Sequence, residues 1–190
     1  SAFGKRIQSQ PSQIDFENQL AIALLKLPFE NAQQLFLEDE SRSIGSMSIP
    51  KEFHDKMAVS PIAMLEESME ARVETIYKDY IYSNFQDFQN DGADDAQEKF
   101  SAFLLGSLER IQRRLGAERH AELHAMMERA LNHSDPAESE ALHRQWIERL
   151  LSEYYDPMYE YQMNKKLDRV VYRGNREEFL AWASDLNRLG

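Results

Sequence analysis

From Ala96 to Met163 every apolar repeat in this sequence has the period of an α-helix, and this block interrupts a different pattern. Before the block, short apolar runs at 33–37 and 61–65 alternate with helical periods. A third short apolar run, at 168–172, follows the block and leads into a closing helix over 176–189. Strands that alternate with helices are typical of a parallel α/β sheet. The sequence therefore predicts an α/β layer, interrupted by a helical insertion and completed by a strand near the end of the chain.

Three segments follow from this pattern. We expect residues 1–92 and 164–190 to form one α/β layer, and residues 93–163 to form the helical insertion. In the first segment, Ser12 is a suitable N-cap for a helix whose apolar side chains, from Ile14 to Leu27, should form a broad buried face.

The insertion itself is predicted to contain three helices, over 96–115, 117–131 and 137–153. Gly116 marks the end of the first, because glycine readily ends a helix. An aromatic-rich stretch at 154–162 follows, and Pro157 is expected to break it.

Composition excludes several classes of function. The chain of 190 residues carries 22 basic and 33 acidic side chains, a formal net charge of −11, and no cysteine. Generic polyanion binding needs a surplus of Lys and Arg, so DNA is not an expected partner. The lack of cysteine excludes disulfides and thiolate-ligated metals in this chain. No apolar run is long enough to span a membrane and no secretory signal pattern is present, so we expect a cytoplasmic protein with no membrane partner.

Glu38 and Asp39 directly follow the apolar run at 33–37, in a polar stretch over 38–49 that is expected to be a loop. A carboxylate at the carboxyl end of a parallel strand is a common place for a Mg²⁺ ligand beside a nucleotide phosphate. Arg42 could contact an anion next to that metal. The alternative is a solvated loop, because acids often follow strands. No G-x-x-x-x-G-K-[ST] motif is present, so the phosphate loop that would accompany such a site is missing from this sequence.

Two basic regions contrast with the acidic background. Tyrosines that precede a basic run could stack on the bases of RNA while the cations hold its phosphates. The candidates for this role are Tyr155, Tyr159, Lys165, Lys166 and Arg173, and a second basic turn contains Arg110, Arg113 and Arg114. The alternatives are an aromatic cluster that packs helices together, and cations that offset the dipole of a helix ending at Gly116.

His120 and His124 are four residues apart on a predicted helix and could share a face. The residues between them do not complete a zinc-binding pattern and no third ligand is evident, so a surface or packing pair is the better interpretation.

Four stretches resemble the carboxyl-terminal part of bacterial tRNA 2-selenouridine synthases. They are SAFG with QPSQIDFENQLA at 1–21, LFLEDESRSIG with the following IP at 35–50, PIAMLEESMEARVETIYKDY at 61–80, and YYDPMYEYQMNKKLDRVVYRGNREEFLAW at 154–182. The EDESRSIG loop and the YYDPMYEYQ block are the specific parts of this resemblance, whereas the strand patterns are generic.

The resemblance implies an α/β fold with an incomplete P-loop-type parallel sheet, helices on its faces and a helical insertion. It implies a transferase that replaces the sulfur of wobble 2-thiouridine in tRNA by selenium, with selenophosphate as donor and a geranylated intermediate made from geranyl diphosphate. The implied partners are tRNA and a rhodanese-like domain of the same polypeptide, and Mg²⁺ is the expected cofactor. The residues that match the family's loop are Glu38, Asp39, Glu40, Ser41, Arg42 and Gly45.

The rhodanese-like domain, its cysteine and the Walker A motif are missing from this sequence, so we expect a fragment that is inactive alone. Two alternatives from other classes stay open. One is a kinase-like P-loop domain, in which Arg72 and Asp79 would contact phosphate from a lid. The other is a helical module that binds a protein partner through the Met and aromatic side chains of 96–163.

Overall fold

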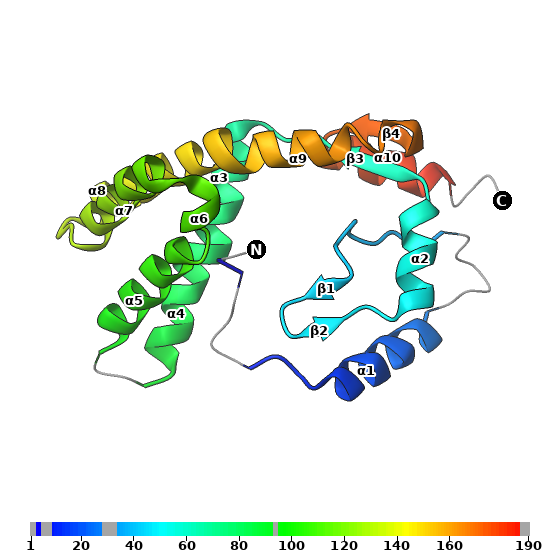
Figure 1. Cartoon of the computed structure of the whole chain (residues 1–190), viewed down its shortest axis with the longest axis horizontal. Helices are drawn as coiled ribbons and strands as arrows, with labels where there is room; N and C mark the ends of the chain where they lie inside the picture. The colour runs from blue at the N-terminus through cyan, green and yellow to red at the C-terminus, as the bar shows by residue number, and fades with distance from the viewer. Residues whose placement is uncertain (1–2, 5–8, 28–33, 93–94, 187–190) are drawn as a thin grey trace. The chain divides into compact units, whose positions relative to one another are not determined.

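The computed structural model describes residues 3–4, 9–27, 34–92 and 95–186, which group into two compact units (Figure 1). We call Gln8–Glu67 together with Lys165–Gly190 the sheet unit. We call Ser1–Ile7 together with Ser68–Asn164 the helical unit. The chain therefore leaves the sheet unit after Glu67 and returns to it at Lys165.

The sheet unit contains two small sheets and three α-helices in its described residues. Its elements are α1 (Gln13–Leu25), β1 (Ser43–Ile44), β2 (Met47–Ser48), α2 (Lys51–Val59), β3 (Ile62–Leu65), the 3-10 turn η3 (Leu167–Arg169), β4 (Val170–Gly174) and α10 (Arg176–Leu186). Strands β1 and β2 form an antiparallel hairpin inside the stretch predicted to be a loop. The predicted strands at 61–65 and 168–172 are confirmed as β3 and β4, with the second displaced by two residues.

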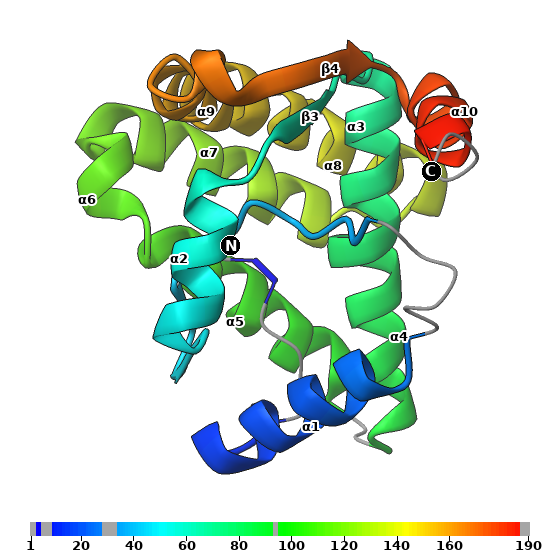
Figure 2. The same ribbon diagram turned by 90° about the vertical axis from the view of Figure 1, so that its right-hand side faces the viewer.

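Strands β3 and β4 pair in parallel, from Ile62 opposite Val170 to Leu65 opposite Gly174 (Figure 2). The ladder continues past the strand end, since the Glu66 N–H donates to the Gly174 carbonyl over 2.9 Å. The whole helical unit lies between these two strands in sequence. The predicted α/β layer with an inserted helical block is thus present as a small parallel sheet, in a chain that is mostly helical.

The prediction of a buried strand at 33–37 is wrong for its described part. Residues 34–40 have no regular secondary structure, and Leu35 and Leu37 are nearly half exposed. Phe36 packs instead on α10, with its ring 5.1 Å from that of Phe179 and 5.9 Å from that of Trp182. An apolar run becomes a buried strand only where a neighbouring strand pairs with it. The described residues provide no such neighbour here.

The first helix forms where it was predicted, but its predicted burial is wrong. The Ser12 side chain accepts a hydrogen bond from the Asp15 N–H at 3.2 Å, which caps α1 as expected. No residue of α1 is buried, and Ile14 and Leu25 are largely exposed. The helical period alone gave the shape of an apolar face and not the surface that covers it.

The helical unit is a bundle in which two segments of π-helix join α-helices end to end. Its elements are α3 (Met69–Ile76), η1 (Tyr77–Tyr82), α4 (Ser83–Asn90), α5 (Ala96–Glu109), α6 (Gln112–Leu115), α7 (Ala117–Leu131), α8 (Pro136–Leu150), η2 (Leu151–Tyr155) and α9 (Asp156–Met163). Helices α7 and α8 lie side by side (Figure 1). The structure groups α3 and α4 with this unit, although the sequence placed them in the segment 1–92. The domain boundaries themselves stay a prediction.

The main hydrophobic core lies in the helical unit. Leu104, Leu108 and Met127 are fully inaccessible there, and Trp146 and Ile147 are nearly so. Ion pairs link the outside of the same helices, for example between Arg144 and both Glu74 and Glu140. In the sheet unit, by contrast, the described buried hydrophobic residues are Met47, Ile49 and Ile62.

Two helix predictions in the insertion need correction. The helix predicted over 96–115 is two, because Arg110 and Ile111 separate α5 from α6. Pro157 does not break the chain's helical course, since it lies in the first turn of α9. The first turn of a helix tolerates proline, whose missing N–H would have no intrahelical acceptor there. The predicted helix at 117–131 is confirmed.

Candidate functional site

Two glutamine side chains hold the loop that was predicted to bind a metal and an anion. Gln10 Nε2 donates to the Ile44 carbonyl at 3.1 Å, and the Ser46 N–H donates to Gln10 Oε1 at 2.8 Å. Gln13 binds the Ser48 N–H and carbonyl in the same way, at 2.8 Å each. Each amide side chain thus pairs with the hairpin as the peptide group of a neighbouring strand would. Sequence reasoning missed this role, because the two glutamines are more than 30 residues from their partners.

Gly45 makes this clamp possible. Its φ is +65°, in the left-handed region that favours glycine, and a Cβ there would lie 2.3 Å from Gln10 Oε1. The turn between β1 and β2 therefore requires glycine for both its backbone and the space that Gln10 occupies. The predicted phosphate-binding role of Gly45 stays a prediction.

The acidic part of the loop faces a cation from the segment that enters β4. Lys166 Nζ lies 2.5 Å from Asp39 Oδ2, with both side chains about one third exposed. The structure thus brings together a residue predicted to bind a metal and one predicted to bind tRNA. In the described part of the chain, no three or more Asp, Glu or His side chains are grouped closely enough to hold a metal ion. Glu38 and Asp39 alone supply two carboxylates, which suit Mg²⁺ when phosphate oxygens and water complete its shell.

Arg42 and Ser41 present donors next to these acids. The Arg42 Nε donates to the Ile49 carbonyl at 3.4 Å, and no described group pairs with its two terminal nitrogens. The Ser41 hydroxyl donates to the Ser43 carbonyl at 2.9 Å. The exposed guanidinium of Arg42 is therefore anchored at one end and open at the other, which suits it to bind an anion.

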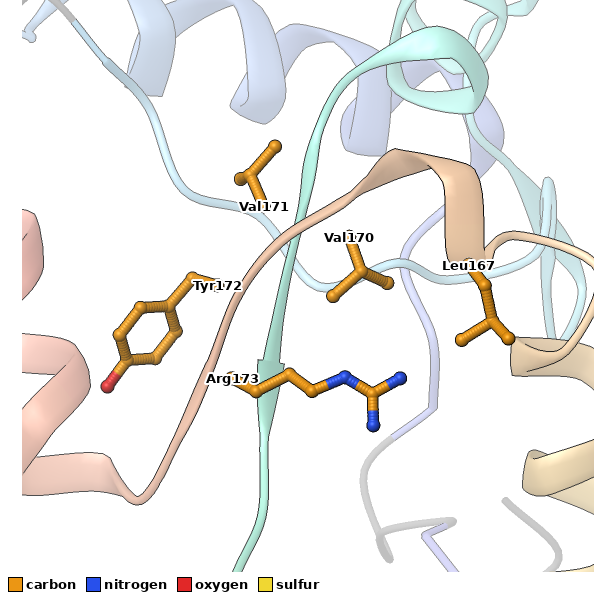
Figure 3. A pocket seen from close by; sticks show the side chains of 5 residues that line it. All are labelled: Leu167, Val170, Val171, Tyr172 and Arg173. Atoms are coloured by element: carbon orange, nitrogen blue, oxygen red, sulfur yellow. The ribbon is translucent and has the colours of Figure 1, made fainter.

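The carboxyl end of β4 adds a further cation to the sheet unit. Arg173 Nη1 lies 3.4 Å from Glu66 Oε1, and both side chains are about half exposed. Figure 3 shows Arg173 and Tyr172 on opposite sides of the strand, beside a shallow hollow of about 330 Å³. Tyr172 stacks on Trp182 of α10, with ring centroids 4.5 Å apart. Burial and the nearby Glu178 carboxylate raise the pKa of the Tyr172 phenol, so the neutral form is held there.

Arg169 positions this edge without facing solvent itself. Its guanidinium donates to the Ser60 carbonyl at 2.7 and 2.9 Å and to the Met57 carbonyl at 3.0 Å. These carbonyls belong to the end of α2, where backbone acceptors lack partners within the helix. Arg169 therefore ties α2 to β4 on the side where β3 begins.

Arg72 belongs to the helical unit and is not part of the acidic loop's unit. It makes a bidentate ion pair with Asp156, one bond of which measures 3.1 Å, and both side chains are about one third exposed. This pair joins α3 to α9, and sequence reasoning did not foresee the partner of Arg72. A phosphate-binding role for Arg72 stays a prediction.

The second basic turn is exposed on the helical unit. Arg113 and Arg114 form the last turn of α6, and neither makes an ion pair or hydrogen bond with another described residue. Arg110 donates to the Ser107 hydroxyl at 2.6 Å. Two adjacent cations without counter-ions are a plausible electrostatic contact for a polyanion.

The predicted aromatic and basic RNA-binding segment is divided between the two units. Tyr155 and Tyr159 lie on the helical unit, whereas Lys165, Lys166 and Arg173 lie on the sheet unit. Both tyrosines line an apolar pocket of about 160 Å³ within the helical unit. The other residues that line it are Phe3, Ile76, Tyr80, Trp146, Ile147, Leu150 and Leu151.

Two histidines of the helical unit are structural. Trp146 Nε1–H donates to His143 Nδ1 at 2.9 Å, and burial lowers the pKa of His143 from 6.5 to about 4. His120 Nε2 is buried 3.1 Å from Glu109 Oε1, without hydrogen-bond geometry. The ring of His120 lies 5.9 Å from that of His124, as expected for a packing pair.

Comparisons with known proteins identify the family. Residues 1–188 match the family described as the tRNA 2-selenouridine synthase AAA domain. The chain belongs to this family. A tRNA 2-selenouridine synthase from Azotobacter vinelandii is 46% identical over 183 residues, which are 96% of this chain and 50% of that protein. Those of Pseudomonas syringae pv. tomato and Marinobacter nauticus are 45% and 40% identical, over 97% and 96% of this chain and 51% and 50% of their own lengths.

The chain thus spans about half the length of the curated relatives that it matches. No solved structure matches it, so a P-loop-type arrangement of β3 and β4 has no structural neighbour to support it. Among the helices that the structure describes, none has the length and apolar character needed to cross a membrane.

Proposed function

We propose that this chain is the part of a tRNA-modifying transferase that binds the anionic substrates for replacing sulfur by selenium in wobble 2-thiouridine. Family membership and the printed name of the relatives support the reaction. The observation that carries the assignment is the clamped loop 38–45, in which acids, the open Arg42 guanidinium and Lys166 meet. The proposal includes a P-loop-type sheet, of which β3 and β4 are two strands, and a rhodanese-like domain elsewhere in the polypeptide.

The chemistry explains why such a site needs both charge types. Sulfide is a poor leaving group, so we propose that the thiocarbonyl sulfur first attacks carbon 1 of geranyl diphosphate. The carbon–oxygen bond breaks, and diphosphate leaves with the electron pair. The selenium of selenophosphate then adds to C2 of the base, and the carbon–sulfur bond breaks as geranylthiol leaves. Water finally cleaves the phosphorus–selenium bond and releases phosphate. No oxidant or reductant is needed.

Each residue of the loop has a role in this proposal. Arg42 would bind the phosphate oxygens on which negative charge grows as diphosphate leaves. Glu38 and Asp39 would hold Mg²⁺ together with substrate oxygens, and the ion would supply charge neutralisation of the leaving group. A metal at Asp39 would compete with Lys166, whose ammonium would then be free for phosphate or for tRNA. Ser41 and Gly45 shape the loop around these groups.

Transfer RNA is the proposed macromolecular partner. The unpaired Arg113 and Arg114 are the strongest candidates for its phosphates, with Arg110 beside them. Lys165, Lys166 and Arg173 are further candidates on the sheet unit.

The test is nucleoside mass spectrometry of tRNA from the source organism, with and without the gene that encodes this chain. The proposal predicts loss of 2-selenouridine while 2-thiouridine or its geranylated form persists. Unchanged 2-selenouridine in an organism that makes it would overturn the proposal. A strain complemented with an Arg42→Met variant would then show whether the loop is responsible, with Lys56→Met of the same unit as the control.

A further inference from the structure

Both π-helical segments that the structure describes border the same apolar pocket. Tyr80 comes from η1, and Leu151 and Tyr155 come from η2. Ile76 and Leu150, which also line the pocket, are the last residues before each segment. Segments of π-helix are rare and occur frequently at functional sites. Their meeting at one pocket indicates that the helices are shaped around a ligand and not only around each other.

The lining of this pocket selects an apolar ligand. Trp146, Ile147 and Leu150 form its floor and are at most 4% exposed. The indole N–H of Trp146 is already engaged by His143, so it offers no donor to a ligand. A nucleobase would bury several polar atoms at this floor without partners, which is costly. A hydrocarbon chain has no such atoms and gains from burial.

A cation lies within one helical turn of the pocket on each side. Arg72 precedes Ile76 by four residues on α3, and residues with this spacing share a helix face. Its partner Asp156 follows Tyr155 directly. The bidentate geometry of the pair shows that the Arg72 guanidinium is presented to a pair of acidic oxygens. A phosphate group offers the same pattern of acceptors with more charge, so it can compete with Asp156 for Arg72.

We propose that the helical unit binds an amphiphile with a short isoprenoid chain and an anionic phosphate head, the chain in this pocket and the head at Arg72. This inference rests on the proposed function and deepens it, because it assigns the hydrocarbon part of geranyl diphosphate to the helical unit. It also moves Tyr155 and Tyr159 from contact with RNA to contact with the chain. Tyr159, which is 58% exposed, forms the open rim.

The experiment uses this chain with Trp182→Phe, which leaves Trp146 as its single tryptophan. Titration with geranyl diphosphate should change Trp146 fluorescence to saturation, whereas inorganic diphosphate should not. Tyr159→Ala should weaken binding about tenfold, equivalent to roughly 1.4 kcal/mol. The matched control is Tyr161→Ala, an exposed tyrosine of the same helix that does not line the pocket. Arg72→Met should remove the preference for geranyl diphosphate over geraniol.

Equal affinity of the Tyr159→Ala and Tyr161→Ala variants would overturn the assignment, as would the absence of any saturable change. Circular dichroism of each variant shows whether the bundle is intact, and the exposure of both tyrosines makes unfolding an unexpected result. Failure of the proposed function gives a different pattern. Loss of 2-selenouridine in the deletion strain without binding of geranyl diphosphate overturns the pocket assignment alone. Binding with unchanged 2-selenouridine supports the pocket and overturns the function.

Discussion

Lys166 and Asp39 form an ion pair of 2.5 Å although 127 residues separate them in the sequence. The pair links the loop before β1 to the segment that enters β4, so it closes the sheet unit across the whole helical insertion. One partner is an acid proposed to hold Mg²⁺, and the other is a cation proposed to meet an anion. The exchange of this contact for contacts with metal and phosphate is what the proposed function requires of the loop.

Asp39→Ala in the full-length family enzyme should abolish the Mg²⁺-dependent part of the conversion of 2-thiouridine. Stability should change little, because an ion pair this exposed contributes at most about 1 kcal/mol. The measurements are product formation against Mg²⁺ concentration and the urea midpoint of each protein. Asp55→Ala, which removes the exposed Lys51–Asp55 pair, is the control. Wild-type activity in the Asp39→Ala protein would contradict the metal assignment.

Gly45→Ala should disorder the hairpin without unfolding the chain. The alanine would be strained at a φ of +65° and its Cβ would collide with the Gln10 side chain. A strained backbone of this kind costs of the order of 1 to 2 kcal/mol, and loss of the Gln10 hydrogen bonds adds to that cost. Hydrogen exchange at the Ser46 and Ser48 amides should accelerate, while exchange in α7 and α8 stays unchanged. Gly92→Ala has a positive φ but no neighbour within 4 Å, and serves as the control for strain alone.

The sequence predicted the order of elements well because helical periods and caps are local. The N-cap at Ser12 and the bounds of the helix at 117–131 depend on a few neighbouring residues, and both were found. Burial was predicted poorly, because it depends on distant partners. The run at 33–37 has the composition of a buried strand, yet Leu35 and Leu37 are exposed and Phe36 packs on α10.

The candidate site shows the same limit. Glu38 to Gly45 could be singled out from their pattern, but nothing near Gln10 in the sequence indicates that it binds Ile44 and Ser46. The Asp156 partner of Arg72 is 84 residues away, and was equally invisible.

The two units should unfold in separate steps, with the sheet unit first. The connected cluster of buried hydrophobic side chains lies in the helical unit, whereas Ile14, Leu25 and Val171 of the sheet unit are largely exposed. Burial of apolar surface is the main source of stability, so the sheet unit has less to lose on opening. Hydrogen exchange should be faster for the amides of β3 and β4 than for those of α7 and α8. A single transition, seen by fluorescence and by circular dichroism at the same urea concentration, would contradict this expectation.

The stability of the helical unit should fall as the pH drops from 6.5 towards 4. The pKa of His143 is about 4 in the folded chain and near 6.5 when exposed, so the unfolded state binds the additional proton in this range. His143 contributes fully above pH 6.5, and up to roughly 3 kcal/mol of that stability is lost by pH 4. Urea unfolding between pH 7.5 and 4.5 measures this slope. The His143→Gln variant keeps an acceptor for Trp146 but does not titrate, so its slope should be smaller, and equal slopes would assign the effect to other groups.

Charge reversal at Arg113 should weaken tRNA binding and reduce its dependence on salt. A cation that contacts a phosphate displaces a condensed counter-ion, so its loss lowers the slope of log affinity against log salt by about 1. Arg113→Glu should show this loss, and Arg113→Glu with Arg114→Glu should lower the slope further. The measurement is tRNA affinity across a series of salt concentrations. Both side chains are exposed and unpaired among the described residues, so their reversal should leave the bundle folded.

The control for this prediction is Arg129→Glu, because it changes the net charge by the same amount as Arg113→Glu. Arg129 is an exposed cation in the last turn of α7 and, like Arg113, has no ion pair within the part of the chain that is described. If binding depends only on the overall charge of −11, both variants should weaken it equally. If α6 contacts phosphate directly, the slope should fall with Arg113→Glu and stay unchanged with Arg129→Glu. An unchanged slope in both variants would place the tRNA contact on other residues, of which Lys165, Lys166 and Arg173 are the next to reverse.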